Sequence, residues 1–184
     1  WSVPLEFGPV RVASVAAYDI DGDGNDEIFA GTGKQLDDDG NEIRSAGLVV
    51  LEDDGTIKWT QTFDAAAGVD IHTGKRYQTS SISTAPVFSD LDNDGSIDIV
   101  VGTGGDNGSG DFDVVGQPGD VGGVHALNAD GTVKWSFETR DTFGDDGRPD
   151  GVRGAPRVFD IDGDGVREVI FTSWDHYLYI LDGR

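Results

Sequence analysis

Three short segments of the chain share the pattern D-x-D-x-D-G-x-x-(D/E), which places carboxylates at alternate positions of a tight loop. Calcium takes six to eight oxygen ligands, and a glycine at position 6 permits the sharp turn that lets such side chains converge. Position 7 is expected to ligate through its backbone carbonyl, because the valine at this position of the third loop has no side-chain ligand atom. We therefore predict about three Ca²⁺ sites, with these ligand residues: Asp19, Asp21, Asp23, Asn25, Glu27, Asp90, Asp92, Asp94, Ser96, Asp98, Asp160, Asp162, Asp164, Val166 and Glu168.

Three other interpretations of these loops are less favourable. An EF-hand needs a bidentate glutamate at position 12, where this chain has Ala30, Val101 and Phe171. Magnesium keeps most of its waters and uses few protein ligands, so four carboxylates per loop suit calcium better. The loops could also be merely polar turns, but uncompensated carboxylates repel each other strongly. Three copies in register favour a bound cation.

The acidic loops belong to a longer internal repeat. The segment at 18–33 recurs at 89–104 and at 159–174, and GLVVLEDDGTIKW at 47–59 matches GVHALNADGTVKW at 123–135. Short apolar runs at 28–30, 99–101 and 169–171 predict buried strands, and 48–51, 124–127 and 178–181 predict a further strand in each repeat. The Asp-Gly pairs at 54–55 and 130–131 predict tight hairpins.

Four short antiparallel strands per repeat, without any helical periodicity, are typical of β-propeller blades. We predict an all-β chain of about three blades that forms a single repeat domain over residues 1–184. Residues 1–7 would form an outer strand, 8–60 blade 1, 61–138 blade 2 and 139–184 an incomplete blade 3. Propellers have about 4–8 blades, so a partner or a longer chain would complete the ring. Residues 1–7 could supply the missing strand, within the chain or to a neighbouring copy.

Composition limits the partners. The formal charge of −22 repels nucleic acid and anionic lipid, so we expect neither as a partner. No apolar stretch approaches the ~20 residues that cross a bilayer, so no membrane insertion is expected. The N-terminus lacks the features of a targeting signal, which indicates a mature product or an excised segment. The absence of cysteine excludes disulfides and thiol catalysis.

The acidic loop, the strand that ends in GTG and the DGT-(I/V)-K-W hairpin together resemble the FG-GAP/VCBS repeat family, the calcium-loop propeller blades of integrin α-subunits and many exported bacterial proteins. The resemblance extends over nearly the whole chain. It departs from the family pattern in two places: the Phe-Gly pair of the family is not clearly present within the repeats, and Ser14-Val15 replaces the Ala-Pro of the later repeats. The resemblance implies an extracellular or cell-surface location and adhesion or ligand binding more often than catalysis.

Long connections between repeat strands would meet a ligand, because loops of variable length carry binding functions. Their non-acidic candidates are His72, Lys75, Arg76, Tyr77, Arg148, Arg153 and Trp174, with Trp174 as the best stacking residue. Trp59 and Trp135 recur at one repeat position and are expected in the blade core. No catalytic motif stands out.

We therefore predict a non-enzymatic, extracellular, calcium-binding propeller module for adhesion, ligand binding or self-assembly, in which calcium is structural. Its partner would be a protein, a glycan or a copy of itself joined through edge strands. The alternative is a propeller segment of a carbohydrate-active enzyme such as a rhamnogalacturonan lyase-like protein.

Overall fold

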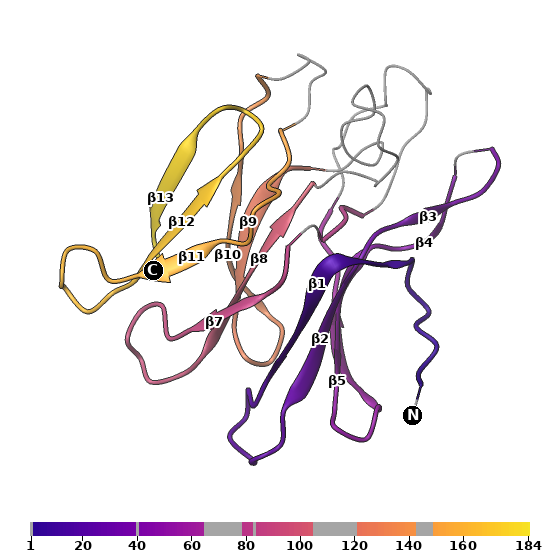
Figure 1. Ribbon diagram of the computed structural model, residues 1–184, viewed down its shortest axis with the longest axis horizontal. Helices are drawn as coiled ribbons and strands as arrows, with labels where there is room; N and C mark the ends of the chain where they lie inside the picture. Colours follow the sequence, from indigo (N-terminus) through magenta and orange to yellow (C-terminus); the bar gives the residue numbers. More distant parts are fainter. Residues whose placement is uncertain (1, 40, 65–78, 83, 105–120, 143–148) are drawn as a thin grey trace.

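The computed structural model describes residues 2–39, 41–64, 79–82, 84–104, 121–142 and 149–184. Its secondary structure consists of strands in antiparallel sheets, and the three large sheets lie side by side (Figure 1). No helix in the described ranges has the length and hydropathy needed to cross a membrane. The predicted all-β fold with propeller-type blades is confirmed.

Blades 1 and 2 are four-stranded sheets with equivalent topology. Blade 1 has the strand order β1-β2-β5-β6, and blade 2 has the order β7-β8-β9-β10. The strands of blade 1 are β1 (Val10–Tyr18), β2 (Glu27–Thr32), β5 (Gly47–Leu51) and β6 (Ile57–Gln61). Those of blade 2 are β7 (Val87–Ser89), β8 (Asp98–Thr103), β9 (Gly123–Leu127) and β10 (Val133–Glu138).

Blade 3 has three strands in the order β11-β12-β13, namely β11 (Arg157–Phe159), β12 (Glu168–Thr172) and β13 (Leu178–Asp182). Its first strand contacts β7, the first strand of blade 2. A small hairpin of β3 (Gln35–Leu36) and β4 (Glu42–Arg44) extends from the connection between β2 and β5.

Two hydrophobic cores hold the blades together. The first lies between blades 1 and 2 and includes Phe29, Val50 and Ile99. The second lies between blades 2 and 3 and includes Val100 and Val169. Successive residues of a strand point to opposite faces of the sheet, so Ile99 faces blade 1 while Val100 faces blade 3. This position between two neighbours explains why every residue of β8 is buried.

Trp59 and Trp135 contribute to these contacts between blades, in agreement with their predicted place in the core. Trp59 packs edge-on against Phe29 and lies over the hairpin of blade 2, where a Cβ on Gly131 would come within 2.7 Å of its ring. Trp135 packs against the second core, and its indole N–H donates a hydrogen bond to the carbonyl oxygen of Gly183 in blade 3 (2.8 Å). Each tryptophan therefore connects its own blade to the next.

The N-terminal segment does not form the expected outer strand, because residues 2–9 contain no strand. The segment instead lies beside the β3–β4 hairpin, where the Arg44 guanidinium donates to the carbonyl oxygen of Leu5 (3.3 Å) and the Gly8 N–H donates to that of Ser45 (3.1 Å). The two ends of the chain lie on opposite sides of the molecule (Figure 1). This segment therefore does not lie along the open edge of β13, and its pairing with a neighbouring copy stays a prediction.

Candidate metal centres

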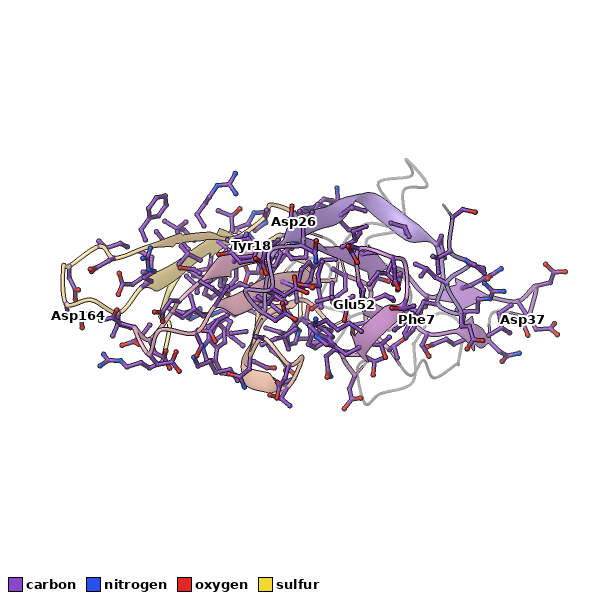
Figure 2. The ribbon with its side chains drawn as sticks, turned by 90° about the horizontal axis from the view of Figure 1, so that it is seen from below. Phe7, Tyr18, Asp26, Asp37, Glu52 and Asp164 are labelled. Carbon is purple, nitrogen blue, oxygen red and sulfur yellow. The ribbon has the colours of Figure 1, made fainter. Side chains whose placement is uncertain are left out.

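The three acidic segments form equivalent loops at one end of the sheets. Loop 1 (residues 19–27) connects β1 to β2, loop 2 (90–98) connects β7 to β8, and loop 3 (160–168) connects β11 to β12. Alternate turns of an antiparallel sheet lie at the same end, so the Asp-Gly hairpins after β5 and β9 share this end with the loops. Figure 1 shows the loops at the end opposite to the β3–β4 hairpin, and Figure 2, from below, shows Asp26 centrally and Asp164 at the far margin.

The aspartate at position 1 fixes the turn in every loop. One carboxylate oxygen of Asp19, Asp90 and Asp160 accepts a hydrogen bond from the N–H of the position 6 glycine, at 3.0, 2.9 and 3.2 Å. These glycines have φ values of 94°, 90° and 91°. A side chain is strongly disfavoured at such angles, which accounts for glycine in all three copies.

Two further hydrogen bonds recur in all three loops. The position 5 aspartate accepts the N–H of position 7, at 2.7–2.8 Å, and this bond also forms at Val166, whose side chain is buried. The position 9 carboxylate accepts the N–H of position 2, at 2.9 Å for Glu27, 3.1 Å for Asp98 and 2.7 Å for Glu168. Backbone N–H groups of the same loop thus orient the carboxylates at positions 1, 5 and 9 of every loop, and in loops 1 and 3 also the carboxylate at position 3.

Each loop gathers carboxylate oxygens closely enough to share one cation. Among the described residues, the groups whose oxygens lie within 4.8 Å of one another are Asp19, Asp21 and Glu27; Asp90, Asp92 and Asp94; and Asp160, Asp162 and Glu168. Calcium–oxygen distances of about 2.3–2.6 Å allow ligand oxygens to lie up to about 5 Å apart. In loop 2, Asp92 Oδ1 is buried and makes no hydrogen bond to any described residue, which leaves an oxygen available for a cation. The donor set fits a hard divalent ion.

The structure brings together only part of the predicted ligand set. Positions 1 and 3 belong to the close group in every loop, joined by position 9 in loops 1 and 3 and by position 5 in loop 2. Asp23, Asp98 and Asp164 lie outside these groups. The side chains of Asn25, Ser96 and Val166 are not in them either, and their predicted role through the backbone carbonyl stays a prediction.

Two lysines that the sequence analysis did not assign to the sites lie against the acidic loops. Lys58 Nζ is 2.6 Å from Asp21 Oδ2 and 3.3 Å from Glu27 Oε1 in loop 1, and it also contacts Glu52. Lys134 Nζ is 2.8 Å from Asp92 Oδ2 and 2.9 Å from Asp98 Oδ2 in loop 2. Both occupy the lysine position of the repeated DGT-(I/V)-K-W hairpin, and that recurrence beside a loop at the same end of the sheet was the signal that could have revealed them.

These ion pairs affect the protonation of both partners. The hydrogen bond to Asp21 raises the pKa of Lys58, and the same contact lowers the pKa of Asp21. Burial lowers the pKa of Lys134, but hydrogen bonds to Asp92 and Asp98 outweigh it, so the net shift is upward. The hydrogen bond from Lys134 also lowers the pKa of Asp92. Both lysines are therefore cations at neutral pH.

At the opposite end of the sheets, two of the predicted ligand-binding residues stack on one another. The Arg153 guanidinium lies 3.8 Å from the centroid of the Trp174 ring, and that of Arg140 lies 4.3 Å from the Tyr177 ring. Asp175 lies between Trp174 and Tyr177 in the sequence and is buried. Its carboxylate accepts hydrogen bonds from the Tyr179 hydroxyl and from the Arg140 backbone N–H. The other candidates of the long connections, His72, Lys75, Arg76, Tyr77 and Arg148, lie outside the described residues.

Comparison with known proteins relates the fold of this chain to a solved enzyme. No family model matches the sequence, and no curated protein matches it. The resemblance to FG-GAP/VCBS repeats therefore stays a prediction. Among solved structures, the chain is similar to the crystal structure of the exotype rhamnogalacturonan lyase YesX, with a TM-score of 0.52 and 18% sequence identity. The match covers 94% of this chain and 31% of that chain, so this chain spans about a third of the solved one, and at this identity the likeness shows the fold alone.

Proposed function

We propose that this chain is a non-enzymatic, extracellular propeller module that binds about three calcium ions as structural elements and works in adhesion, ligand binding or self-assembly. The observation that carries the proposal is the close grouping of carboxylate oxygens in three equivalent loops at one end of the sheets. Each loop connects the first two strands of a blade, so a cation held there would fix the turn that begins the blade. Extracellular calcium modules bind at about 10⁻⁴–10⁻³ M, which at millimolar calcium stabilises the fold by about 0.5–1.5 kcal/mol per loop.

Calorimetric titration of the chelator-treated chain with calcium tests this proposal. We expect close to three ions per chain and a rise in melting temperature on calcium addition, with magnesium giving a much smaller effect. Asp21→Asn, Asp92→Asn and Asp162→Asn should each remove one ion, because each changes a carboxylate of one close group. Asp39→Asn, in the β3–β4 connection, is the control for the loss of one negative charge. A wild-type chain that binds no calcium would refute the proposal.

The self-assembly part of the proposal rests on one apolar face of blade 3. Leu178 and Ile180 of β13 and Ile161 of loop 3 have exposed fractions of 62%, 56% and 54%. The equivalent residues of blade 1 are Leu48, Val50 and Ile20, and those of blade 2 are Val124, Ala126 and Leu91. All six are at most 7% exposed, because the next blade covers them.

Under the self-assembly proposal, the occupant of this face is a blade of a second copy of the chain. In the two contacts that the structure contains, the equivalent face packs against apolar residues of a following blade, such as Ile99 and Val101 in one case and Val169 and Phe171 in the other. A second copy offers blades of the same repeat. Two copies would contribute six blades, within the range of about 4–8 seen in propellers.

A second candidate function, a segment of a carbohydrate-active enzyme, is favoured by the similarity to the rhamnogalacturonan lyase structure. Under this alternative the Arg153–Trp174 and Arg140–Tyr177 pairs would form part of a sugar-binding surface of a longer protein, because aromatic rings stack on sugars and guanidinium groups bind carboxylates. Affinity electrophoresis in gels that contain rhamnogalacturonan tests whether this surface binds the polysaccharide. Retardation that Trp174→Ala abolishes would support the alternative, whereas unretarded migration favours the leading proposal.

A further inference from the structure

Lys58 and Lys134 take equivalent places against the calcium loops of blades 1 and 2. Each lysine is the second residue of the last strand of its blade, β6 or β10. The tryptophan that recurs in both repeats follows it directly. Each places its ammonium group between the carboxylates at positions 3 and 9 of its loop: Asp21 and Glu27 in one blade, Asp92 and Asp98 in the other. Their side chains are about four-fifths buried, with exposed fractions of 20% and 18%. The ion pairs are therefore shielded more than those of a freely exposed lysine.

Loop 3 has a different electrostatic environment. Within the part of the chain that the structure describes, the cation recorded beside this loop is Arg184, whose Nη2 is 3.8 Å from Asp164 Oδ2. Arg184 pairs more closely with Asp182, at 2.8 Å, and it is largely exposed. Asp164 is also not a member of the close group Asp160, Asp162 and Glu168.

We infer that Lys58 and Lys134 are built-in counter-cations that lower the calcium affinity of loops 1 and 2. This inference rests on the proposed calcium binding. A calcium ion bound by the position 3 carboxylate either shares that carboxylate with the lysine ammonium group or displaces the ammonium group from it. In both cases the positive charge of the lysine, a few ångströms away, opposes calcium binding. At that separation the repulsion between a unit charge and a divalent ion amounts to about tenfold or more in Kd, even with the dielectric constant of water.

The same lysines stabilise the metal-free fold. Without a cation, the carboxylates of a loop repel one another, and a paired lysine offsets that repulsion. Blades 1 and 2 therefore keep their loops formed when calcium is withdrawn. The lysine thus has opposite effects on two measurable quantities: it raises stability in chelator and lowers affinity for calcium.

Calorimetric titration of Lys58→Met and Lys134→Met with calcium tests the inference. Each variant should have one site whose Kd falls about tenfold relative to the wild type, together with a lower melting temperature in chelator. Lys58→Arg keeps the charge and should retain wild-type affinity. Arg44→Met, at the opposite end of blade 1, changes the net charge by the same amount far from the loops and is the matched control. Asp21→Asn and Asp92→Asn should each remove the site that the neighbouring lysine weakens.

The possible outcomes separate this inference from the proposed function. If the wild type binds no calcium, the proposed function fails. If the wild type binds calcium but both methionine variants bind it with unchanged or weaker affinity, the lysines are only structural and the inference is overturned. If one methionine variant does not fold in chelator, the other methionine variant decides the outcome. A Kd below that of the wild type supports the inference, and an unchanged or higher Kd overturns it.

Discussion

At the scale of single residues, His125 is a buried titratable group outside the acidic loops. Its ring stacks on Phe63 with centroids 4.1 Å apart, and its two nitrogens lie within hydrogen-bond distance of the hydroxyls of Ser136 (2.8 Å) and Thr103 (3.2 Å). Burial lowers the pKa of His125 to about 4, because the imidazolium form would lose its hydration. In the unfolded chain the same group titrates near its ordinary value of about 6.5.

We predict that His125 makes stability depend on pH between about 6.5 and 4. The unfolded chain takes up a proton as the pH falls through 6.5, whereas the folded chain remains neutral at this site until about 4. The free energy of unfolding should therefore fall by roughly 3 kcal/mol over this window as the solution is acidified. Urea unfolding of the wild type and His125→Gln in chelator, at pH 7 and 4.5, measures this term. The variant should lose distinctly less stability on acidification, and equal losses in both proteins would contradict the prediction.

At the scale of the structural elements, the contact between neighbouring blades depends on a glycine in a hairpin. Gly131 has a φ of 87°, and a Cβ at this position would lie 2.7 Å from the Trp59 ring. Gly24 in loop 1 has a similar φ of 94°, but a Cβ there would meet no atom within 4 Å. Both positions therefore have a left-handed backbone that disfavours a side chain. Only at Gly131 would an added side chain also meet the neighbouring blade.

We predict that Gly131→Ala destabilises the chain more than Gly24→Ala does. The left-handed conformation should cost both variants about 1–2 kcal/mol. The clash with Trp59 should add about 1–3 kcal/mol for Gly131→Ala alone, because a ring packed between two blades has little room to move. Urea unfolding in chelator measures both changes. Equal losses of stability in the two variants would show that Trp59 can shift at little cost.

At the scale of the whole molecule, the blades form an open arrangement with unequal ends. Blade 2 is covered on both faces, whereas blade 3 exposes Phe159, Ile161, Leu178 and Ile180. Contiguous exposed apolar side chains of this kind mark interaction sites in folded proteins. The side of the molecule with Phe7 and Asp37 lies at the opposite end from Asp164 (Figure 2), so the two ends present different surfaces to a partner.

We predict that the chain associates in a concentration-dependent manner through this face of blade 3. Leu178→Lys and Ile180→Lys should each shift the equilibrium to the monomer, because a charge would have to be buried against the next blade. Val133→Lys, which changes an exposed valine of blade 2, is the matched control and should associate as the wild type does. Sedimentation velocity at several protein concentrations, in 0.15 M salt with and without calcium, measures the equilibrium. A wild type that remains monomeric throughout would exclude this interface.

The sequence by itself determined the local structure of this protein. Short apolar runs indicate where strands form, because successive side chains of a strand point to opposite faces of the sheet. Strands β2, β8 and β12 form at the predicted runs. The turns of the acidic loops are also local, because the hydrogen bonds that shape them join residues at most seven positions apart. Such contacts depend on backbone geometry and on the side chains nearby, both of which can be recognised from one segment.

The tertiary structure alone decided which distant residues meet. Lys58 lies 37 residues from Asp21 in the sequence, and their contact exists only because β6 begins at the end of the sheet where loop 1 lies. The position of residues 2–8 beside β4, away from the open edge of β13, likewise depends on how the blades stack rather than on the segment itself. Apolar patterning specifies that a face will be covered, but it does not specify by what. The burial of Leu48 and the exposure of Leu178, at equivalent positions of the repeat, therefore depend on the presence of a neighbouring blade.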